Sequence, residues 1–242
     1  MTLTTEFIDV AVADGTTMRA YLARPPGDPA PVGVIVVHEL FGVNPDIQSV
    51  VDDLAHAGHV ALAPEFYHRD TDPGHWLPRD DAGRNDGFAL LHNMNRQDAL
   101  ADVTASVAYL RSSGGADDVA VVGFSAGGHL AFLAACQLPI TRTAVLYGGW
   151  LSTTDIPLSR PEPTLTLAPG ITGRLLYLVG QDDSLIDAAQ RDQITAALTA
   201  AGVDHEMVVY PGTQHAFFWP HTPTFNPTAR ADAWHRIFDL IS

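Results

Sequence analysis

The sequence comprises 242 residues, of which 46% are hydrophobic and 17% charged, a composition typical of a globular protein and unlike that of a disordered chain. Its 28 acidic residues outnumber 13 basic residues, all of them arginine, so the formal net charge of −15 disfavours nucleic acids and anionic membranes as partners. The lack of lysine excludes a Schiff-base or P-loop lysine, and the single cysteine, Cys136, excludes an internal disulfide and a metal cage of several thiolates.

The chain also lacks the sequence signals of membrane insertion and secretion. No apolar run approaches the roughly 18 residues of a membrane span. The N-terminal segment Met1–Glu6 has neither the basic head nor the apolar stretch of a secretory signal. We therefore expect a soluble, cytoplasmic protein with one domain over residues 1–242, a monomer or a small homo-oligomer, with no metal and no cofactor.

Short β-branched runs alternate with longer amphipathic stretches, which predicts an α/β fold with a mostly parallel central sheet and helices on both faces. In chain order we expect strands at 6–12 and 17–23, forming a hairpin around Asp14-Gly15, a buried strand at 32–38, a helix at 46–57 and a strand at 60–63. A long loop over 64–86 and a helix over 87–111, broken near its start, follow. The remaining elements are a strand at 119–122, a helix at 126–137, a strand at 144–147, a loop at 151–170, a strand at 175–179, a helix at 187–201, a strand at 206–210 and a helix at 230–241.

The most informative motif lies between a predicted strand and a predicted helix. Gly123-Phe124-Ser125-Ala126-Gly127 has the pattern G-x-S-x-G, which in this context predicts a sharp turn that projects the Ser125 hydroxyl above the carboxyl end of the sheet. The Ala126 N–H at the helix start is then placed to donate to an oxyanion. The alternative is an ordinary tight turn after a strand of a Rossmann-like sheet.

A serine nucleophile needs a base and a carboxylate to orient that base. Of the 11 histidines, His215 follows the last predicted strand, where an α/β hydrolase carries its base. Most of the other histidines are expected at the surface or in loops. The carboxylate should follow the strand at 175–179, where Asp182 and Asp183 compete. The spacing of Gly180, Asp183 and Ile186 favours Asp183, and Asp182 would then be a helix cap or a solvated neighbour.

Several segments together resemble the dienelactone hydrolase family of α/β hydrolases. The resemblance covers nearly the whole chain in order and rests on 37–44 (VHELFGVN), 63–69 (APEFYHR), the turn around Ser125, 147–148 (YG), 180–186 (GQDDSLI), 210–217 (YPGTQHAF) and 233–236 (AWHR). It implies Ser125 as nucleophile, Asp183 as acid and His215 as base, with the oxyanion held by the N–H groups of Leu40 and Ala126.

The resemblance also marks candidate substrate-binding or auxiliary residues: Glu39, Trp219, Tyr67 and Arg69. Two positions depart from the family pattern. The nucleophile is serine where the best-known members have cysteine, and Trp219 stands where members that bind dienelactone have an arginine four residues after the histidine. Trp219, with Phe217, Phe218 and Trp76, could form an apolar substrate pocket or ordinary core packing.

Glu39 has two interpretations. It is either the family's active-site glutamate or a carboxylate that caps a loop or binds an arginine. Its sequence neighbours lack the family's usual arginine partner. For a substrate carboxylate, Arg69, Arg79 and Arg84 in the long loop could supply a cation in place of the arginine that Trp219 replaces. Cys136, on the apolar helix that follows Ser125, is expected to be a buried core thiol.

From the residues and the resemblance we predict a serine hydrolase, carboxymethylenebutenolidase-like, that cleaves small carboxylic esters or lactones through an acyl-enzyme. The alternatives are a thioesterase or peptidase on the same scaffold, because a fold does not fix a function, and a non-catalytic binding relative. A binding relative would be expected to lack Ser125, Asp183 or His215, and all three are present.

Overall fold

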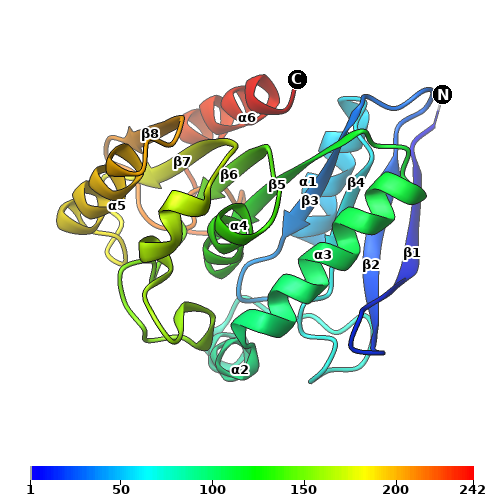
Figure 1. Ribbon diagram of the computed structural model, residues 1–242, viewed down its shortest axis with the longest axis horizontal. Helices are drawn as coiled ribbons and strands as arrows, with labels where there is room; N and C mark the ends of the chain where they lie inside the picture. The colour runs from blue at the N-terminus through cyan, green and yellow to red at the C-terminus, as the bar shows by residue number, and fades with distance from the viewer. Residues whose placement is uncertain (1) are drawn as a thin grey trace.

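The computed structural model describes residues 2–242, and within that range eight strands form one sheet in the order β1-β2-β4-β3-β5-β6-β7-β8 (Figure 1). Strand β2 pairs antiparallel with β1 and β4, and every pairing from β4 through β3 to β8 is parallel. The strands are β1 (Thr4–Ala11), β2 (Thr17–Arg24), β3 (Val32–Val37), β4 (Ala61–Pro64), β5 (Asp118–Phe124), β6 (Arg142–Leu146), β7 (Arg174–Gly180) and β8 (His205–Tyr210). The predicted α/β class with a mostly parallel sheet is confirmed.

Helices cover both faces of the sheet, and this explains why its central strands are apolar throughout. Strand β3 is buried at all six positions, as expected for a parallel strand covered on both sides. On one face α3 (Arg96–Ser112) packs against α4 (Ala126–Gln137), and both lie in front of the sheet in Figure 1. On the other face α1 (Pro45–His56) contacts β2, β3 and β4, and α6 (Pro227–Ile241) contacts β6 and β7. Helix α5 (Ala188–Ala200) lies beside β8 at the sheet edge.

The segment between β4 and β5 differs from the sequence prediction. The long loop ends at residue 80, because α2 (Asp81–Asn93) begins where the Asp80 side chain accepts a hydrogen bond from the Gly83 N–H (2.8 Å). The predicted helix over 87–111 is two helices, and the break lies at Met94 and Asn95 rather than near its start. There the Asn95 side chain accepts from the Asp98 N–H (2.9 Å) and caps the new helix α3. The predicted loop at 151–170 contains two 3₁₀ turns, η1 (Pro157–Ser159) and η2 (Thr164–Gly170).

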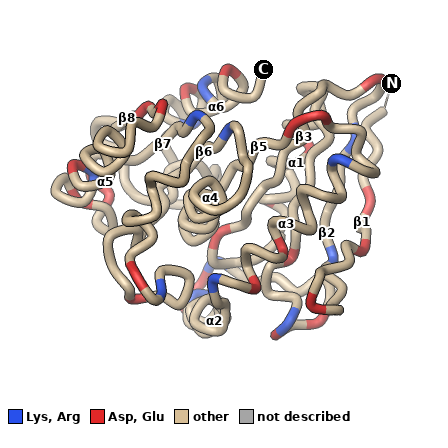
Figure 2. Tube along the Cα trace, viewed as in Figure 1, with Lys and Arg blue, Asp and Glu red and all other residues tan. Residues whose placement is uncertain are grey.

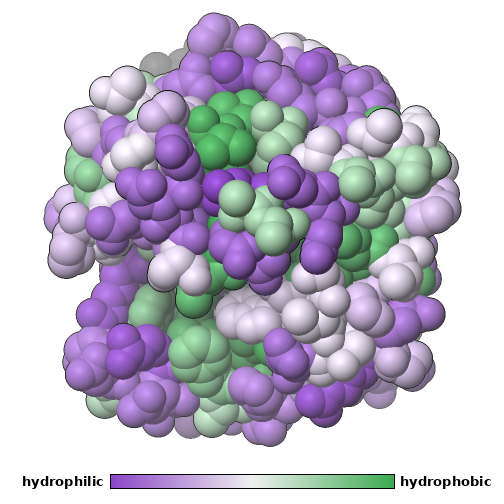
Figure 3. All heavy atoms as spheres, turned by 90° about the vertical axis from the view of Figure 1, so that its left-hand side faces the viewer, coloured by the Kyte–Doolittle hydropathy of each residue, from purple (hydrophilic) through white to green (hydrophobic). Residues whose placement is uncertain are grey.

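Acidic and basic residues are distributed along the whole trace (Figure 2). Acidic residues dominate, as the composition requires, and the arginines lie among them. The face that carries α5 and β8 is mostly hydrophilic with smaller apolar areas between (Figure 3). None of the helices in residues 2–242 combines the length and the apolar character that crossing a membrane requires.

Candidate active site

Ser125 occupies a strained turn between β5 and α4. Its backbone has φ 52° and ψ −114°, a left-handed conformation that non-glycine residues rarely adopt. Two hydrogen bonds hold the turn: the Ser125 N–H donates to the Leu146 oxygen (2.9 Å), and the Ser125 oxygen accepts from the His129 N–H (3.1 Å). This strain holds the hydroxyl at the carboxyl end of the sheet, as the G-x-S-x-G pattern predicts.

Glycines surround Ser125 because neighbouring backbone lies too close for any side chain. A Cβ on Gly123 would lie 2.1 Å from the Gly127 oxygen, and a Cβ on Gly127 would lie 2.3 Å from the Val37 oxygen. A Cβ on Gly128 would meet the Gly148 Cα at 2.9 Å. Glycine at these positions therefore allows α4 to pack closely against β3 and the loop after β6.

The structure brings Ser125, His215 and Asp183 into one hydrogen-bonded chain. The Ser125 Oγ lies 3.0 Å from His215 Nε2, and His215 Nδ1 lies 2.8 Å from Asp183 Oδ2. Because the carboxylate can only accept, Nδ1 carries the proton and Nε2 is free to accept from the serine hydroxyl. The three residues follow β5, β8 and β7, so the parallel sheet delivers them to one edge.

The geometry distinguishes the two neighbouring aspartates. Asp183 is 3% exposed, and its other oxygen, Oδ1, accepts from the backbone N–H groups of Leu185 (2.9 Å) and Ile186 (3.2 Å). Asp182 is exposed, and its backbone N–H donates to the Thr213 oxygen. The loop thus orients the Asp183 carboxylate toward His215 and turns Asp182 to solvent.

Tyr147 packs against the His215 imidazole in a segment of strained backbone. The Tyr147 ring meets the His215 ring edge-on, with centroids 4.9 Å apart. Among residues 2–242 four non-glycine residues have positive φ, namely Ser125, Tyr147, Trp150 and Ala216, and all lie in loops at this edge of the sheet. Strained backbone concentrated in this way is typical of functional sites.

Leu40 and Ala126 are the residues expected to supply the two N–H groups that hold the oxyanion. Within residues 2–242 neither the Leu40 N–H nor the Ala126 N–H donates to another group of the chain. The Leu40 carbonyl accepts from the Tyr67 hydroxyl (3.3 Å), and a Cβ on Gly87 would lie 2.6 Å from Leu40 Cγ. Tyr67 and the helix α2 therefore hold the Leu40 peptide in place from two sides.

His38 is buried and hydrogen-bonded to backbone groups, whereas most histidines other than His215 were expected at the surface or in loops. It is 3% exposed, its Nδ1 donates to the Glu39 oxygen (2.7 Å), and its Nε2 accepts from the Phe66 N–H (3.3 Å). Burial lowers the pKa of His38 to about 4, so the ring stays neutral near pH 7. The sequence signal was its position at the end of a continuous apolar run, where a polar side chain needs internal partners.

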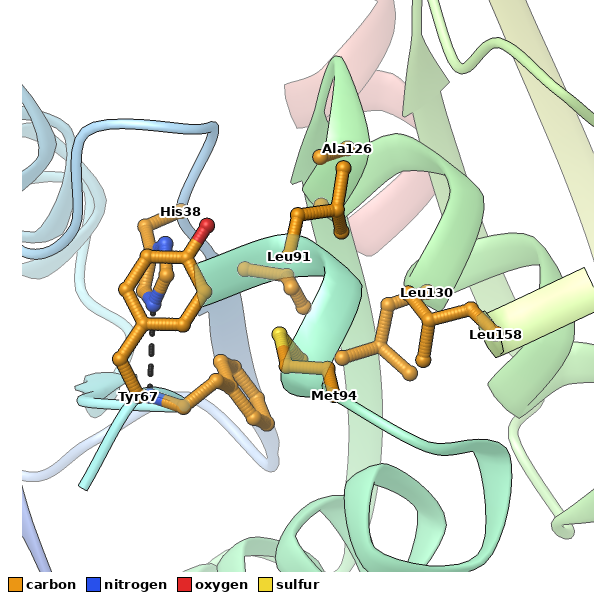
Figure 4. Close-up of a pocket in the computed structure, with 10 residues that line it drawn as sticks. His38, Tyr67, Leu91, Met94, Ala126, Leu130 and Leu158 are labelled. Carbon is orange, nitrogen blue, oxygen red and sulfur yellow. Dashed lines mark hydrogen bonds between the residues drawn. The ribbon is translucent and has the colours of Figure 1, made fainter. Parts of the chain in front are cut away.

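A small apolar cavity lies between His38 and the start of α4 (Figure 4). In Figure 4 His38 and Tyr67 face Ala126 and a group of aliphatic side chains from α2, α4 and η1, and the dashed line marks the hydrogen bond between His38 and the Phe66 N–H. The aliphatic and thioether side chains are Leu91, Met94, Leu130 and Leu158.

Glu39 has an arginine partner, which corrects the sequence expectation. It is 3% exposed, pairs with Arg79 through Oε1, and accepts at Oε2 from the Trp219 indole N–H (2.9 Å). Burial raises its pKa, and Arg79 and Trp219 oppose that rise. Arg79 also pairs with Asp46 (3.0 Å), so two carboxylates share its one positive charge. Its guanidinium lies over the Trp219 ring, 4.9 Å from the centroid.

The structure also shows the burial and the contacts of the remaining candidate residues. Trp219 is 2% exposed and packs on Phe124, with ring centroids 4.8 Å apart, so it belongs to the core and to the support of Glu39. Phe217 and Phe218 are also core residues, while Trp76 is 46% exposed. The Arg69 guanidinium donates to the carboxylates of Asp14 and Asp102. Cys136 is buried, as expected.

Comparison with known proteins gives consistent results over the full chain. Residues 18–242 match the profile described as "Dienelactone hydrolase family". A Synechocystis protein named "Putative carboxymethylenebutenolidase" is 34% identical over 229 residues, which cover 93% of this chain and 91% of the relative. An Escherichia coli K12 protein of the same name is 31% identical and covers 94% of this chain and 83% of the relative.

Solved structures agree on the fold. A crystal structure of a "Putative Dienelactone Hydrolase" from Klebsiella pneumoniae superposes with a TM-score of 0.89 at 27% identity, covering 100% of this chain and 99% of the other. An esterase of Pyrococcus furiosus superposes with a TM-score of 0.73 at 14% identity, covering 99% and 92%. The second similarity shows the α/β-hydrolase fold alone.

Proposed function

The chain belongs to the dienelactone hydrolase family, and from this premise we propose that it is a serine hydrolase that cleaves small carboxylic esters or lactones through an acyl-enzyme. One observation carries the proposal: the hydrogen-bonded chain from Ser125 through His215 to Asp183. A hydroxyl that touches a neutral imidazole nitrogen, with a buried carboxylate on the other nitrogen, is the arrangement that activates serine.

In the first half of the reaction Ser125 Oγ attacks the ester carbonyl carbon while His215 Nε2 takes the hydroxyl proton. Asp183 accepts from Nδ1–H and stabilises the imidazolium that forms. The carbonyl oxygen becomes an oxyanion, and the Leu40 and Ala126 N–H groups donate to it. The C–O bond to the leaving group then breaks, and His215 returns the proton to the leaving oxygen. In the second half, water repeats the attack on the acyl group and releases Ser125.

Glu39 and its partners act as positioning residues in this scheme. The hydrogen bond from Trp219 and the ion pair with Arg79 fix the Glu39 side chain, and the next residue supplies an oxyanion N–H. His38 and Tyr67 bind the carbonyls on either side of that N–H. The oxyanion donors are thus held before substrate arrives, which is where their contribution to rate comes from.

The charge around Arg79 supports a preference for neutral substrates. Arg79 pairs with both Glu39 and Asp46, so these three groups together carry one negative charge when both acids are ionised. Trp219 stands four residues after His215, where members that bind dienelactone have an arginine, and it is buried. A substrate carboxylate would therefore meet no unpaired cation here, and a buried charge without a partner costs several kcal/mol. We expect neutral esters and lactones to react faster than a dienelactone with a free carboxylate.

Hydrolysis of p-nitrophenyl acetate by the purified protein tests the proposal. Wild type should hydrolyse it with saturation, and Ser125→Ala and His215→Ala should each lose a factor of about 10⁴ or more in kcat, because nucleophile and base act as a unit. A variant that keeps a tenth of the wild-type rate would contradict the assignment. A wild-type protein that binds esters without turning them over would instead indicate the non-catalytic relative.

A further inference from the structure

A cleft opens directly beside His215. It has a volume of about 160 Å³ and is lined by Gly149, Trp150, Thr153, Asp155, Leu185, Gln190 and His215. The lining comes from the loop after β6, the loop after β7 and the start of α5. Because the imidazole forms part of the wall, any group in this cleft is next to the reacting atoms.

Trp150 adopts a backbone conformation that costs energy. Its φ is 59°, in the left-handed region, where a bulky side chain is an outlier. The two preceding residues, Gly148 and Gly149, could adopt such a conformation without strain. The half-buried indole packs edge-to-face against the ring of Phe88 in α2, with ring centroids 6.4 Å apart. Strain kept at a large aromatic residue beside a catalytic centre points to a ligand contact.

Two further features of the cleft also indicate a ligand. Leu185 is 52% exposed, although it is a large apolar side chain, and it stands two residues after Asp183. The Thr153 hydroxyl oxygen is buried and makes no hydrogen bond within residues 2–242. Buried polar atoms normally have a partner, so this hydroxyl has bonding capacity left for a bound molecule.

The fixed charge of the cleft is negative. Asp155 is exposed, lines the cleft, and enters none of the ion pairs of residues 2–242. The nearby cations are directed elsewhere. Arg160 donates to the backbone oxygens of Thr154 and Asp155, and Arg191 donates to three backbone oxygens of the loop after β7. An indole ring and an unpaired carboxylate in one cleft are the groups that recognise ammonium cations.

We propose that this cleft binds the alcohol part of the ester and prefers an alcohol whose far end carries an ammonium group over a neutral one. The inference rests on the proposed function, because it uses His215 as the acid that protonates the leaving oxygen, which places the leaving group on the imidazole side. Trp150 contacts the cation with its ring face, Leu185 packs on the alkyl spacer, and Asp155 supplies the charge.

The test uses two esters of the same shape and different charge, acetylcholine and 3,3-dimethylbutyl acetate, in which carbon replaces the quaternary nitrogen. Comparing the ratio of their kcat/KM values between variants cancels effects on the chemical step, including the intrinsic difference in reactivity of the two esters. An exposed cation–π contact and an exposed charge pair each contribute a factor of about 2–5. The ratio in wild type should therefore favour acetylcholine about 5–20-fold at low salt and fall as salt is added.

Substitutions inside and outside the cleft test whether this preference arises there. Asp155→Asn and Trp150→Leu should each reduce the ratio about 2–5-fold. Asp192→Asn is the matched control, because Asp192 is an exposed aspartate of α5 outside the cleft and its loss changes the net charge equally. The control should leave the ratio unchanged.

Three outcomes would overturn the inference. They are a wild-type ratio of one or less, an Asp155→Asn ratio equal to that of wild type, and an equal fall in Asp155→Asn and Asp192→Asn, which would assign the preference to net charge. In each case hydrolysis of the neutral ester would leave the proposed function standing. If Ser125→Ala hydrolysed both esters at the wild-type rate, the proposed function itself would fail.

Discussion

Replacing Asp183 by asparagine removes one negative charge and keeps the side-chain shape. In the native loop Asp183 Oδ1 accepts from the N–H groups of Leu185 and Ile186, so the asparagine oxygen should take that position. The amide NH₂ then faces His215 Nδ1, from which Asp183 Oδ2 is 2.8 Å away in the native protein. Two donors cannot share a hydrogen bond, so the imidazole must shift its proton to Nε2.

A proton on Nε2 points at the serine hydroxyl and prevents the imidazole from accepting the serine proton. The equivalent change in a serine protease lowers kcat about 10⁴-fold. We expect a loss of about 10³–10⁴ here, which corresponds to about 4–5.5 kcal/mol of transition-state stabilisation. KM should change little, since Asp183 lies behind His215 and is 3% exposed.

The assay is steady-state hydrolysis of p-nitrophenyl acetate by Asp183→Asn and by the neighbouring variant Asp182→Asn. Asp182 is exposed and its side chain makes no hydrogen bond within residues 2–242, so its replacement should change kcat less than about threefold. Circular dichroism and a denaturation curve check that both variants are folded. A loss in kcat of less than tenfold in Asp183→Asn, or a larger loss in Asp182→Asn than in Asp183→Asn, would contradict the claim that Asp183 keeps the His215 proton on Nδ1.

The other predictions concern stability, pH and substrate charge. Trp219→Phe leaves Glu39 Oε2 without the indole donor and should lower the free energy of unfolding, measured by urea denaturation, by about 1–3 kcal/mol. A change below about 0.5 kcal/mol would show that this hydrogen bond contributes little to stability. Burial lowers the pKa of His38 and of His129 to about 4 from an ordinary 6.5, so below pH 6.5 the unfolded chain binds protons that the native protein does not. Stability should therefore fall as pH drops from 6.5 to about 4, by up to about 3 kcal/mol for each histidine, and His129→Gln should flatten that fall in denaturation curves measured between pH 7 and 4.5. A neutral short-chain ester should have a higher kcat/KM than a dienelactone with a free carboxylate; the opposite order would mean that Arg79 leaves its two carboxylates to bind the substrate.

Much of the fold could be predicted because its signals are local. Continuous apolar runs mark the buried parallel strands, and the turn around Ser125 is required by backbone contacts that leave room only for glycine at residues 123 and 127. The start of α2 and the break before α3 were missed because their caps, Asp80 and Asn95, lie in a segment rich in polar residues and glycine, where apolar periodicity is weak.

The surroundings of the candidate site were less predictable, because they depend on contacts between distant segments. Trp219 was identified as a departure from the family pattern, but its hydrogen bond to Glu39 joins residues 180 positions apart and leaves no local signature. The pairing of Arg79 with Glu39 has the same cause. Spacing along one loop was enough to favour Asp183 over Asp182, because three residues fix which side chain of a tight turn points inward.

Covalent labelling with a fluorophosphonate tests the central proposal, an activated serine, most directly. The reagent phosphonylates a serine only where a base removes the hydroxyl proton, and the adduct is stable enough to locate by peptide mass spectrometry. We predict one label per chain, on the peptide that contains Ser125, with no label in Ser125→Ala and labelling slowed at least about 10³-fold in His215→Ala. Labelling of another residue, or an unchanged rate in His215→Ala, would contradict the account.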